Sequence, residues 1–169
     1  MSAPDPHHGR FVVVPASYVF PLREGDAGTE VLLQLRRGTG YMDGHWAAAA
    51  AGHVEQGETA YDAARREALE EIGLADLDLT FVTAMQRTRG GEAIDERIDF
   101  FFTARTWRGE PHVVEPEKSG GLRWCALDAL DTLPDPVVPH ERAVLDGLRA
   151  GTTSPYSTFG FDGAAVGAP

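Results

Sequence analysis

The sequence predicts a mixed α/β layer fold, and two features of the chain carry this prediction. Strand-like runs stand on both sides of one strongly helical segment, and a second helical pattern lies near the C-terminus. The chain has 169 residues, of which 43% are hydrophobic, so it can bury a sizeable core. We find no internal repeat and no linker, and we therefore expect one domain at residues 10–150 between tails at 1–9 and 151–169.

The segments before the central helix alternate between apolar runs and loops. Residues 11–20 have the pattern of a buried strand in which Pro15 marks a bulge or an edge, and residues 21–29 have that of a turn-rich loop. The run VLLQL predicts a second strand at 31–35. Five consecutive alanines occupy residues 47–51, where we expect a strand although alanine prefers helices.

The rest of the chain continues this alternation, with an acidic and turn-prone loop at 111–121. The expected elements are a helix at 59–72, strands at 79–87, 97–106 and 122–126, and a helix at 140–149 that contains Gly147. The C-terminal tail is rich in small residues but includes Tyr156, Phe159 and Phe161. Disorder and docking against the domain or a partner protomer are both open for this tail.

The central helix has clear end signals. Thr59 suits the N-cap, Asp62 three residues later resembles a capping box, and Gly73 suits the position after the helix end. One face is apolar, and a neighbouring arc carries three carboxylates, those of Glu67, Glu70 and Glu71. Like charges at this spacing destabilise a helix by roughly 0.2–0.5 kcal/mol per pair. A hard divalent cation such as Mg²⁺ would reverse that penalty.

These carboxylates belong to a longer pattern over residues 52–74. It reads G-x5-E-x7-R-E-x-x-E-E-x-G-apolar, with its specified positions at Gly52, Glu58, Arg66, Glu67, Glu70, Glu71, Gly73 and Leu74. The alternative interpretation is a solvated acidic face, with Asp62 paired to Arg66 and Arg66 to Glu70. Eight specified positions in this order favour a dedicated site. The segment resembles the signature box of the Nudix hydrolases.

The resemblance implies an α/β/α sandwich around a mixed sheet, with a Mg²⁺ site that Mn²⁺ could also occupy. It makes Glu67, Glu70, Glu71 and the carbonyl of Gly52 the metal ligands. Glu58 and Arg66 would hold the helix and orient a ligand glutamate, and contacts of this kind fix the geometry of metal ligands. The sequence departs from the family before the box, where residues 47–51 lack the usual proline and the run is one residue longer.

The implied reaction is hydrolysis of a nucleoside diphosphate linked to another group, a nucleoside triphosphate first among the candidates. Water attacks one phosphorus, and metal ions activate it and neutralise charge. The general base is Glu70, Glu71 or a carboxylate on the acidic loop, where the resemblance favours Glu117 over Glu115. Both loop glutamates also fit solvated surface charges.

Substrate contacts are less specified by the sequence. Arg36 or Arg37 could bind phosphate or simply face solvent, and Tyr41, Trp46 or Phe101 could stack on a base, with Phe101 better suited to the core. Three other functions are open. The first is a sensor without turnover, which would lack a box glutamate. The others are a hydrolase of ADP-ribose or nucleotide sugars and a prenyl diphosphate isomerase. The isomerase would need a cysteine early in the chain.

Composition limits the partners. The net charge of −11 argues against binding to a nucleic-acid polymer or an anionic membrane. Cys125 is the only cysteine, which rules out an internal disulfide and suits a small buried residue. No apolar run is long enough to span a membrane, and the N-terminus lacks a signal-peptide core. We therefore expect a cytoplasmic protein, for which a homodimer is compatible with the sequence.

Overall fold

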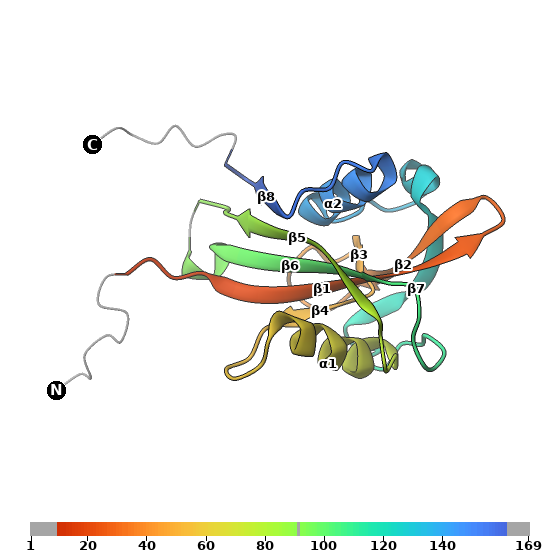
Figure 1. The fold of residues 1–169 in the computed structure, drawn as a ribbon, viewed down its shortest axis with the longest axis horizontal. Coiled ribbons are helices and arrows are strands. Elements are labelled where there is room, and N and C mark those ends of the chain that lie inside the picture. Colours follow the sequence, from red (N-terminus) through yellow and green to blue (C-terminus); the bar gives the residue numbers. More distant parts are fainter. Residues whose placement is uncertain (1–9, 91, 162–169) are drawn as a thin grey trace.

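The computed structural model describes residues 10–90 and 92–161 as a sheet between two helical layers. In Figure 1, α1 (Ala60–Ile72) lies below the sheet and α2 (Pro139–Ala150) above it. The strands are β1 (Val14–Gly25), β2 (Gly28–Arg36), β3 (Trp46–Ala48), β4 (Ala50–His53), β5 (Leu79–Arg87), β6 (Arg97–Ala104), β7 (Ser119–Ala126) and β8 (Tyr156–Phe159). The predicted α/β/α sandwich is confirmed.

The sheet has the order β3-β2-β1-β6-β5-β8, with β4 added beside β1 and β7 beside β2. It is mixed, because β1 pairs with β6 and β5 with β8 in parallel, whereas the remaining pairs are antiparallel. Two short 3₁₀ helices complete the described elements, η1 (Ala93–Asp95) and η2 (Leu127–Thr132).

The long central strand β1 corrects two predictions. It begins three residues later than expected, at Val14, and continues to Gly25, so residues 21–29 form a hairpin with β2 instead of a loop. On one edge β1 pairs first with β4 as far as Val19 and then with β2 from Leu22 onward. Pro21 lies at this change of partner, the kind of irregular position where a sheet tolerates a residue without an N–H group.

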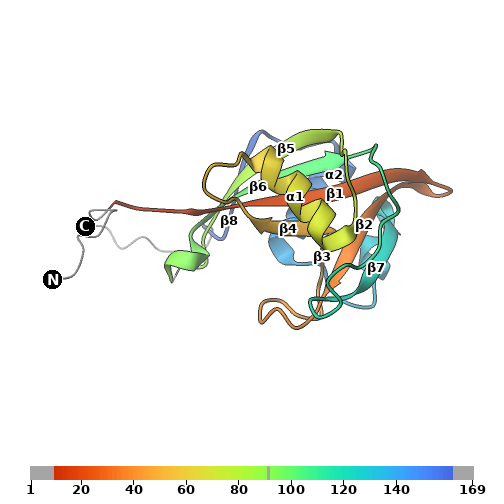
Figure 2. The ribbon, with the colours of Figure 1, turned by 90° about the horizontal axis from the view of Figure 1, so that it is seen from below.

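The central helix was predicted almost to the residue. Thr59 caps it and forms a reciprocal capping box with Asp62, and Gly73 ends it in the left-handed conformation at φ 69°. Ala64, Ala68 and Ile72 are fully buried against the sheet. Tyr61, expected on the same apolar stripe, is 41% exposed and packs at the helix edge. Figure 2 shows α1 lying across β1, β4 and β6.

The alanine run forms strands, as expected, but it divides at Ala49 into β3 and β4. Ala49 and Ala50 are fully buried in the cluster that also contains Ala64 and Ala68 of the central helix. Small side chains on both surfaces let a helix approach a sheet closely. The alanines therefore determine how near α1 lies to β4.

The C-terminal half differs from the predictions mainly in its boundaries. Strand β7 begins at Ser119, three residues before the expected start, and α2 covers residues 139–150. Beyond residue 150, β8 adds to the sheet beside β5, and the Tyr156 hydroxyl donates to Gln86 (2.9 Å). The tail predicted at 1–9 and residues 162–169 lie outside the described residues. None of the helices described is long and apolar enough to cross a membrane.

Candidate active site

Arg66 gathers the charged residues of the box. Its guanidinium donates to the carboxylates of Glu58 (2.7 Å), Glu67 (2.6 Å) and Glu70 (3.2 Å). It also donates to the carbonyl of His53 (3.0 Å), which ties α1 to the end of β4. The alternative interpretation paired Asp62 with Arg66. Asp62 instead bonds to Thr59 in the helix cap. Arg66 is thus a bridge between the box loop and the helix.

Glu67 lies against the backbone of Gly52. A Cβ placed on Gly52 would overlap the Glu67 carboxylate, so any other residue here would displace that carboxylate from its present position. The Glu67 side chain is 13% exposed, and its burial raises the pKa of the carboxyl, although Arg66 opposes the shift. The Gly52 backbone and the Glu67 carboxylate therefore adjoin each other, as a shared metal site requires.

Glu71 points toward the sheet. Its carboxylate accepts from the backbone N–H of Ala51 (3.2 Å) and from the side chain of Gln34 (3.4 Å). Burial raises the pKa of Glu71 to about 7, and the charges of Glu67 and Glu115 act in the same direction. Glu70 differs from both neighbours, because its side chain is 55% exposed. The arc of three glutamates thus divides into two inward carboxylates and one outward carboxylate.

The residues present fit a hard divalent cation. Within residues 10–90 and 92–161, no three His, Cys, Asp or Glu side chains already converge on one point, and Glu67 and Glu70 are both paired with Arg66. The donors are carboxylate oxygens beside a glycine backbone, the chemistry that Mg²⁺ prefers. The pKa values of Glu67 and Glu71 are raised first by burial and then by neighbouring carboxylates, and a cation would oppose both effects.

The acidic loop approaches the box helix. The backbone N–H of Val114 donates to the carbonyl of Glu71 (3.0 Å), and that of His112 to the carbonyl of Ile72 (3.1 Å). Glu115 is half-buried and pairs with Lys118 (3.0 Å), and its charge raises the pKa values of Glu67 and Glu71.

Glu117, the loop carboxylate favoured from sequence, is exposed. Its backbone carbonyl packs against Gly38, while its charge acts on Lys118. The structure therefore brings Glu115 to the box more directly than Glu117.

A cavity of about 520 Å³ opens on the α2 side of the sheet. Gly52 belongs to its wall and also adjoins the carboxylate of Glu67. The remaining lining comes from seven elements and from the loop after β2: Ala16, Tyr18, Arg36, Thr39, Tyr41, Ala51, His53, Arg87, Ile94, Asp95, Arg97 and Glu141. Three arginines in this wall offset the negative charge of the chain locally.

A buried polar network includes three residues of the cavity wall, Arg87, Arg97 and Glu141. Asp99 is fully buried and accepts from Arg87 (2.8 Å) and Arg97 (3.3 Å). Nε2 of His140 lies 3.9 Å from both Asp99 and Glu141 and has no hydrogen-bond partner among the described residues. Burial lowers the pKa of His140 to about 2, so this imidazole is neutral.

The predicted substrate residues separate in the structure. Arg36 and Tyr41 line the cavity, whereas Arg37 is exposed and is not part of its wall. Trp46 is 7% exposed and packs in the core on the α2 side, and Phe101 is fully buried there, as expected. The buried charged residues of β5, β6 and α2 were missed, because nothing in one sequence shows that these three elements meet.

The comparisons with known proteins agree with this geometry. The chain matches the NUDIX domain over residues 13–148. It is also 31% identical over 115 residues to an isopentenyl-diphosphate Delta-isomerase from Jannaschia, an alignment that spans 66% of this chain and 63% of that protein. The chain thus spans less than two thirds of the length of this curated relative.

Solved structures show the same fold. The MutT NUDIX hydrolase from Burkholderia pseudomallei is 27% identical with a TM-score of 0.69, covering 80% of this chain and 97% of that one. The NUDIX domain of Shewanella oneidensis NrtR, solved with ADP ribose, is 15% identical with a TM-score of 0.69, covering 87% and 92%. The chain belongs to the Nudix family. Enzymes of this family generally use divalent metal cations.

Proposed function

We propose that this protein is a Mg²⁺-dependent pyrophosphohydrolase that cleaves a nucleoside diphosphate linked to another group, with a nucleoside triphosphate as the first candidate. The observation that carries the proposal is the shared position of Gly52. Its backbone adjoins the Glu67 carboxylate and also forms part of the cavity wall. A ligand in the cavity can therefore extend its phosphates to the box carboxylates.

Each group in the site then has a physical role. Glu67, Glu70 and Glu71, with the carbonyl of Gly52, would hold the cation, which polarises phosphoryl oxygens and lowers the pKa of bound water. Arg66 orients two of these carboxylates, since it contacts both Glu67 and Glu70. Glu115 and Glu117 are the loop candidates for the base, and Glu115 is favoured because its charge acts on Glu67 and Glu71.

The isomerase named among the relatives is the second candidate. A prenyl diphosphate isomerase of this fold would need a catalytic cysteine early in the chain. The chain has one cysteine, Cys125 on β7, which is 7% exposed, packs in the core and is absent from the cavity lining. A sensor without turnover is disfavoured because every box glutamate is present. Hydrolysis of ADP-ribose or a nucleotide sugar remains the alternative within the proposed class.

The test is a substrate panel with the purified protein and Mg²⁺, in which phosphate, pyrophosphate and nucleotide products are measured separately. The panel contains the nucleoside triphosphates, ADP-ribose, a nucleotide sugar and isopentenyl diphosphate. We expect release of pyrophosphate and a nucleoside monophosphate from at least one triphosphate. Isomerisation of isopentenyl diphosphate without hydrolysis of any nucleotide would overturn the proposal. A cytoplasmic location and a possible homodimer are parts of this proposal that fractionation and light scattering would test.

A further inference from the structure

The acidic loop ends in a tight turn that fixes the backbone of Lys118. Its N–H donates to the carbonyl of Glu115 (3.1 Å), and its carbonyl accepts from the N–H of Arg37 (3.0 Å), just after β2. Pro116 takes the second position of this turn, where its fixed φ is favoured. Lys118, the residue before β7, is therefore tied both to its own loop and to the neighbouring strand.

The side chain of Lys118 turns back to the same glutamate. Nζ donates to both carboxylate oxygens of Glu115, at 3.0 and 3.1 Å. The hydrogen bond to Glu115 is the largest cause that raises the pKa of Lys118, and the charge of Glu117 adds to the shift. Glu117 itself is exposed. The turn therefore selects Glu115 as the partner of the lysine.

This ion pair lies beside the box carboxylates. Val114, the residue before Glu115, donates its N–H to the carbonyl of Glu71 (3.0 Å), which ties this part of the loop to α1. Burial raises the pKa of Glu71, and the charges of Glu67 and Glu115 add to that shift. The charge of Lys118 opposes it. One ammonium thus stands among carboxylates whose mutual repulsion would otherwise drive Glu115 away from the box.

Folding stability does not account for this pair. The side chain of Lys118 is 54% exposed and that of Glu115 is 32% exposed. Ion pairs this open to water contribute little to stability, because water screens the attraction and two long side chains lose conformational freedom. Removal of the lysine charge should therefore leave the fold intact, so that an effect on turnover reports what the lysine does to Glu115.

We propose that Lys118 is a positioning residue, whose ammonium holds the Glu115 carboxylate beside the box, where that carboxylate takes a proton from the attacking water. This inference rests on the proposed function for the reaction. The water oxygen bonds to phosphorus as the bond from that phosphorus to the leaving phosphate oxygen breaks, and the water proton passes to Glu115. Lys118 transfers no group and acts through its charge.

Because the chain has one lysine, amine chemistry removes this charge without a substitution. An N-hydroxysuccinimide ester of acetic acid makes the ε-amine a neutral amide, whereas reductive methylation keeps its charge. Both reagents also modify the N-terminal amine, so Lys118→Arg receives the same treatments as a control. We expect acetylation to lower the kcat of the wild type at least about 10-fold with little change in KM. Methylation of the wild type and acetylation of Lys118→Arg should each leave the rate before treatment nearly unaltered.

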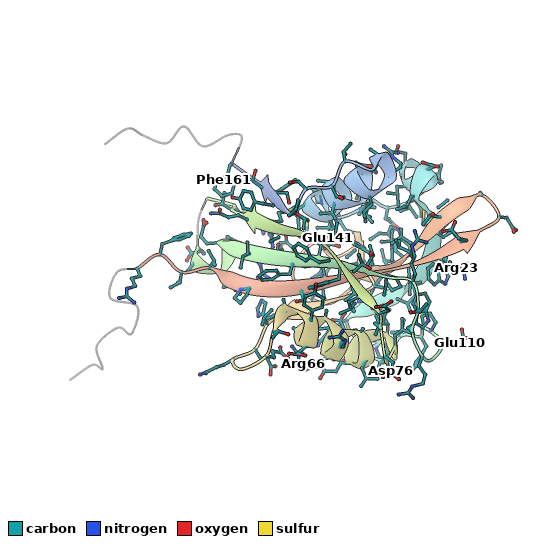
Figure 3. The ribbon with its side chains drawn as sticks, viewed as in Figure 1. Arg23, Arg66, Asp76, Glu110, Glu141 and Phe161 are labelled. Atoms are coloured by element: carbon teal, nitrogen blue, oxygen red, sulfur yellow. The ribbon has the colours of Figure 1, made fainter. Side chains whose placement is uncertain are left out.

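A double-mutant cycle separates action through Glu115 from direct contact with the substrate. Lys118→Met should lower kcat in the wild-type background and have no further effect in Glu115→Gln, because the group it positions is then gone. Glu110→Gln is the matched background, in which Lys118→Met should keep its full effect. Figure 3 shows Glu110 on the segment between β6 and β7, away from Arg66 on α1. Independent effects of the two substitutions, or a wild-type kcat in Glu115→Gln or after acetylation, would overturn the inference.

A further measurement needs no turnover. The rate at which Lys118 is acetylated is followed by peptide mass spectrometry, with the N-terminal amine as internal standard. Only the unprotonated amine reacts, and the hydrogen bond to Glu115 raises the pKa of Lys118. We expect a rate at least about 3-fold higher in Glu115→Gln and an unchanged rate in Glu110→Gln. Equal rates in all three proteins contradict the inference. If no nucleotide in the panel is hydrolysed, the proposed function fails, while these rates still decide whether Glu115 holds Lys118.

Discussion

The Glu67 carboxylate occupies the space that a side chain on Gly52 would fill. The two residues come from different elements, Gly52 from β4 and Glu67 from α1, so this contact joins the strand to the helix. Gly52 has an ordinary backbone φ, outside the left-handed range. Its glycine identity is therefore required by space and not by backbone conformation.

We predict that Gly52→Ala displaces Glu67 and lowers apparent Mg²⁺ affinity by at least about 10-fold, since supporting geometry of this kind typically contributes 10–100-fold. A Mg²⁺ titration of activity measures the effect. Gly147→Ala on α2 is the control, because its Cβ would meet Thr153 at an ordinary 3.5 Å. That control should keep its activity and gain roughly 0.5–1 kcal/mol of stability. Normal Mg²⁺ dependence in Gly52→Ala would contradict the metal assignment.

The box carboxylates should differ in what their loss does. Glu70→Gln or Glu71→Gln is expected to lower turnover by at least about 100-fold, because cation positioning is central to this chemistry. Glu71→Gln should also raise thermal stability without metal, since the buried carboxylate is replaced by a neutral amide. Glu70 is 55% exposed, so its variant should leave stability unchanged. Steady-state rates at saturating Mg²⁺ and melting curves measure both, and near-normal turnover in either variant argues against its role as a ligand.

Arg66 allows a distinction between support of the metal site and a simple surface ion pair. We expect Arg66→Ala to weaken apparent Mg²⁺ affinity and activity by roughly 10–100-fold, because three carboxylates lose their shared partner. A surface pair would cost less than about 1 kcal/mol of stability and leave kinetics unaltered. Arg142→Ala, which removes a comparable bridge between Asp131 and Asp146, is the control.

The acidic loop offers a paired test of the general base. We predict that Glu115→Gln lowers kcat more than it raises KM, the pattern of a group that acts in the transition state. Glu117→Gln should have the smaller effect, because Glu117 is exposed whereas the charge of Glu115 acts on Glu67 and Glu71. Wild-type rates in both variants would place the base within the box, with Glu70 or Glu71 as the candidates.

Glu141 should make stability depend on pH. Its folded-state pKa is raised to about 7 from the ordinary 4.5, and His140, Asp99, Arg36 and Arg87 are the titratable or charged groups around it. A raised pKa means that the folded state binds the proton more tightly than the unfolded state. The contribution of protonated Glu141 to folding stability is therefore complete below pH 4.5 and is lost as the pH rises through about 7. Melting curves between pH 4.5 and 8 should show Glu141→Gln gaining on the wild type as pH increases. A constant difference would contradict the shift.

Local signals in the sequence determined the central helix and its chemistry. The cap at Thr59, the end at Gly73 and the spacing of the box residues all act within a few turns of one chain segment, so a single sequence specifies them. The strands β5 and β6 began where their patterns predicted, because each is a continuous apolar run with clear breaks.

Only the tertiary structure decided which distant residues meet. The cavity unites Arg36 on β2, Arg87 on β5 and Glu141 on α2. The acidic loop docks on the end of α1, where the charge of Glu115 acts on Glu67 and Glu71. Trp46, plausible as a stacking residue from its type, is buried by its neighbours. Such outcomes depend on strand order and packing between elements far apart in sequence, and local propensity contains no information about either.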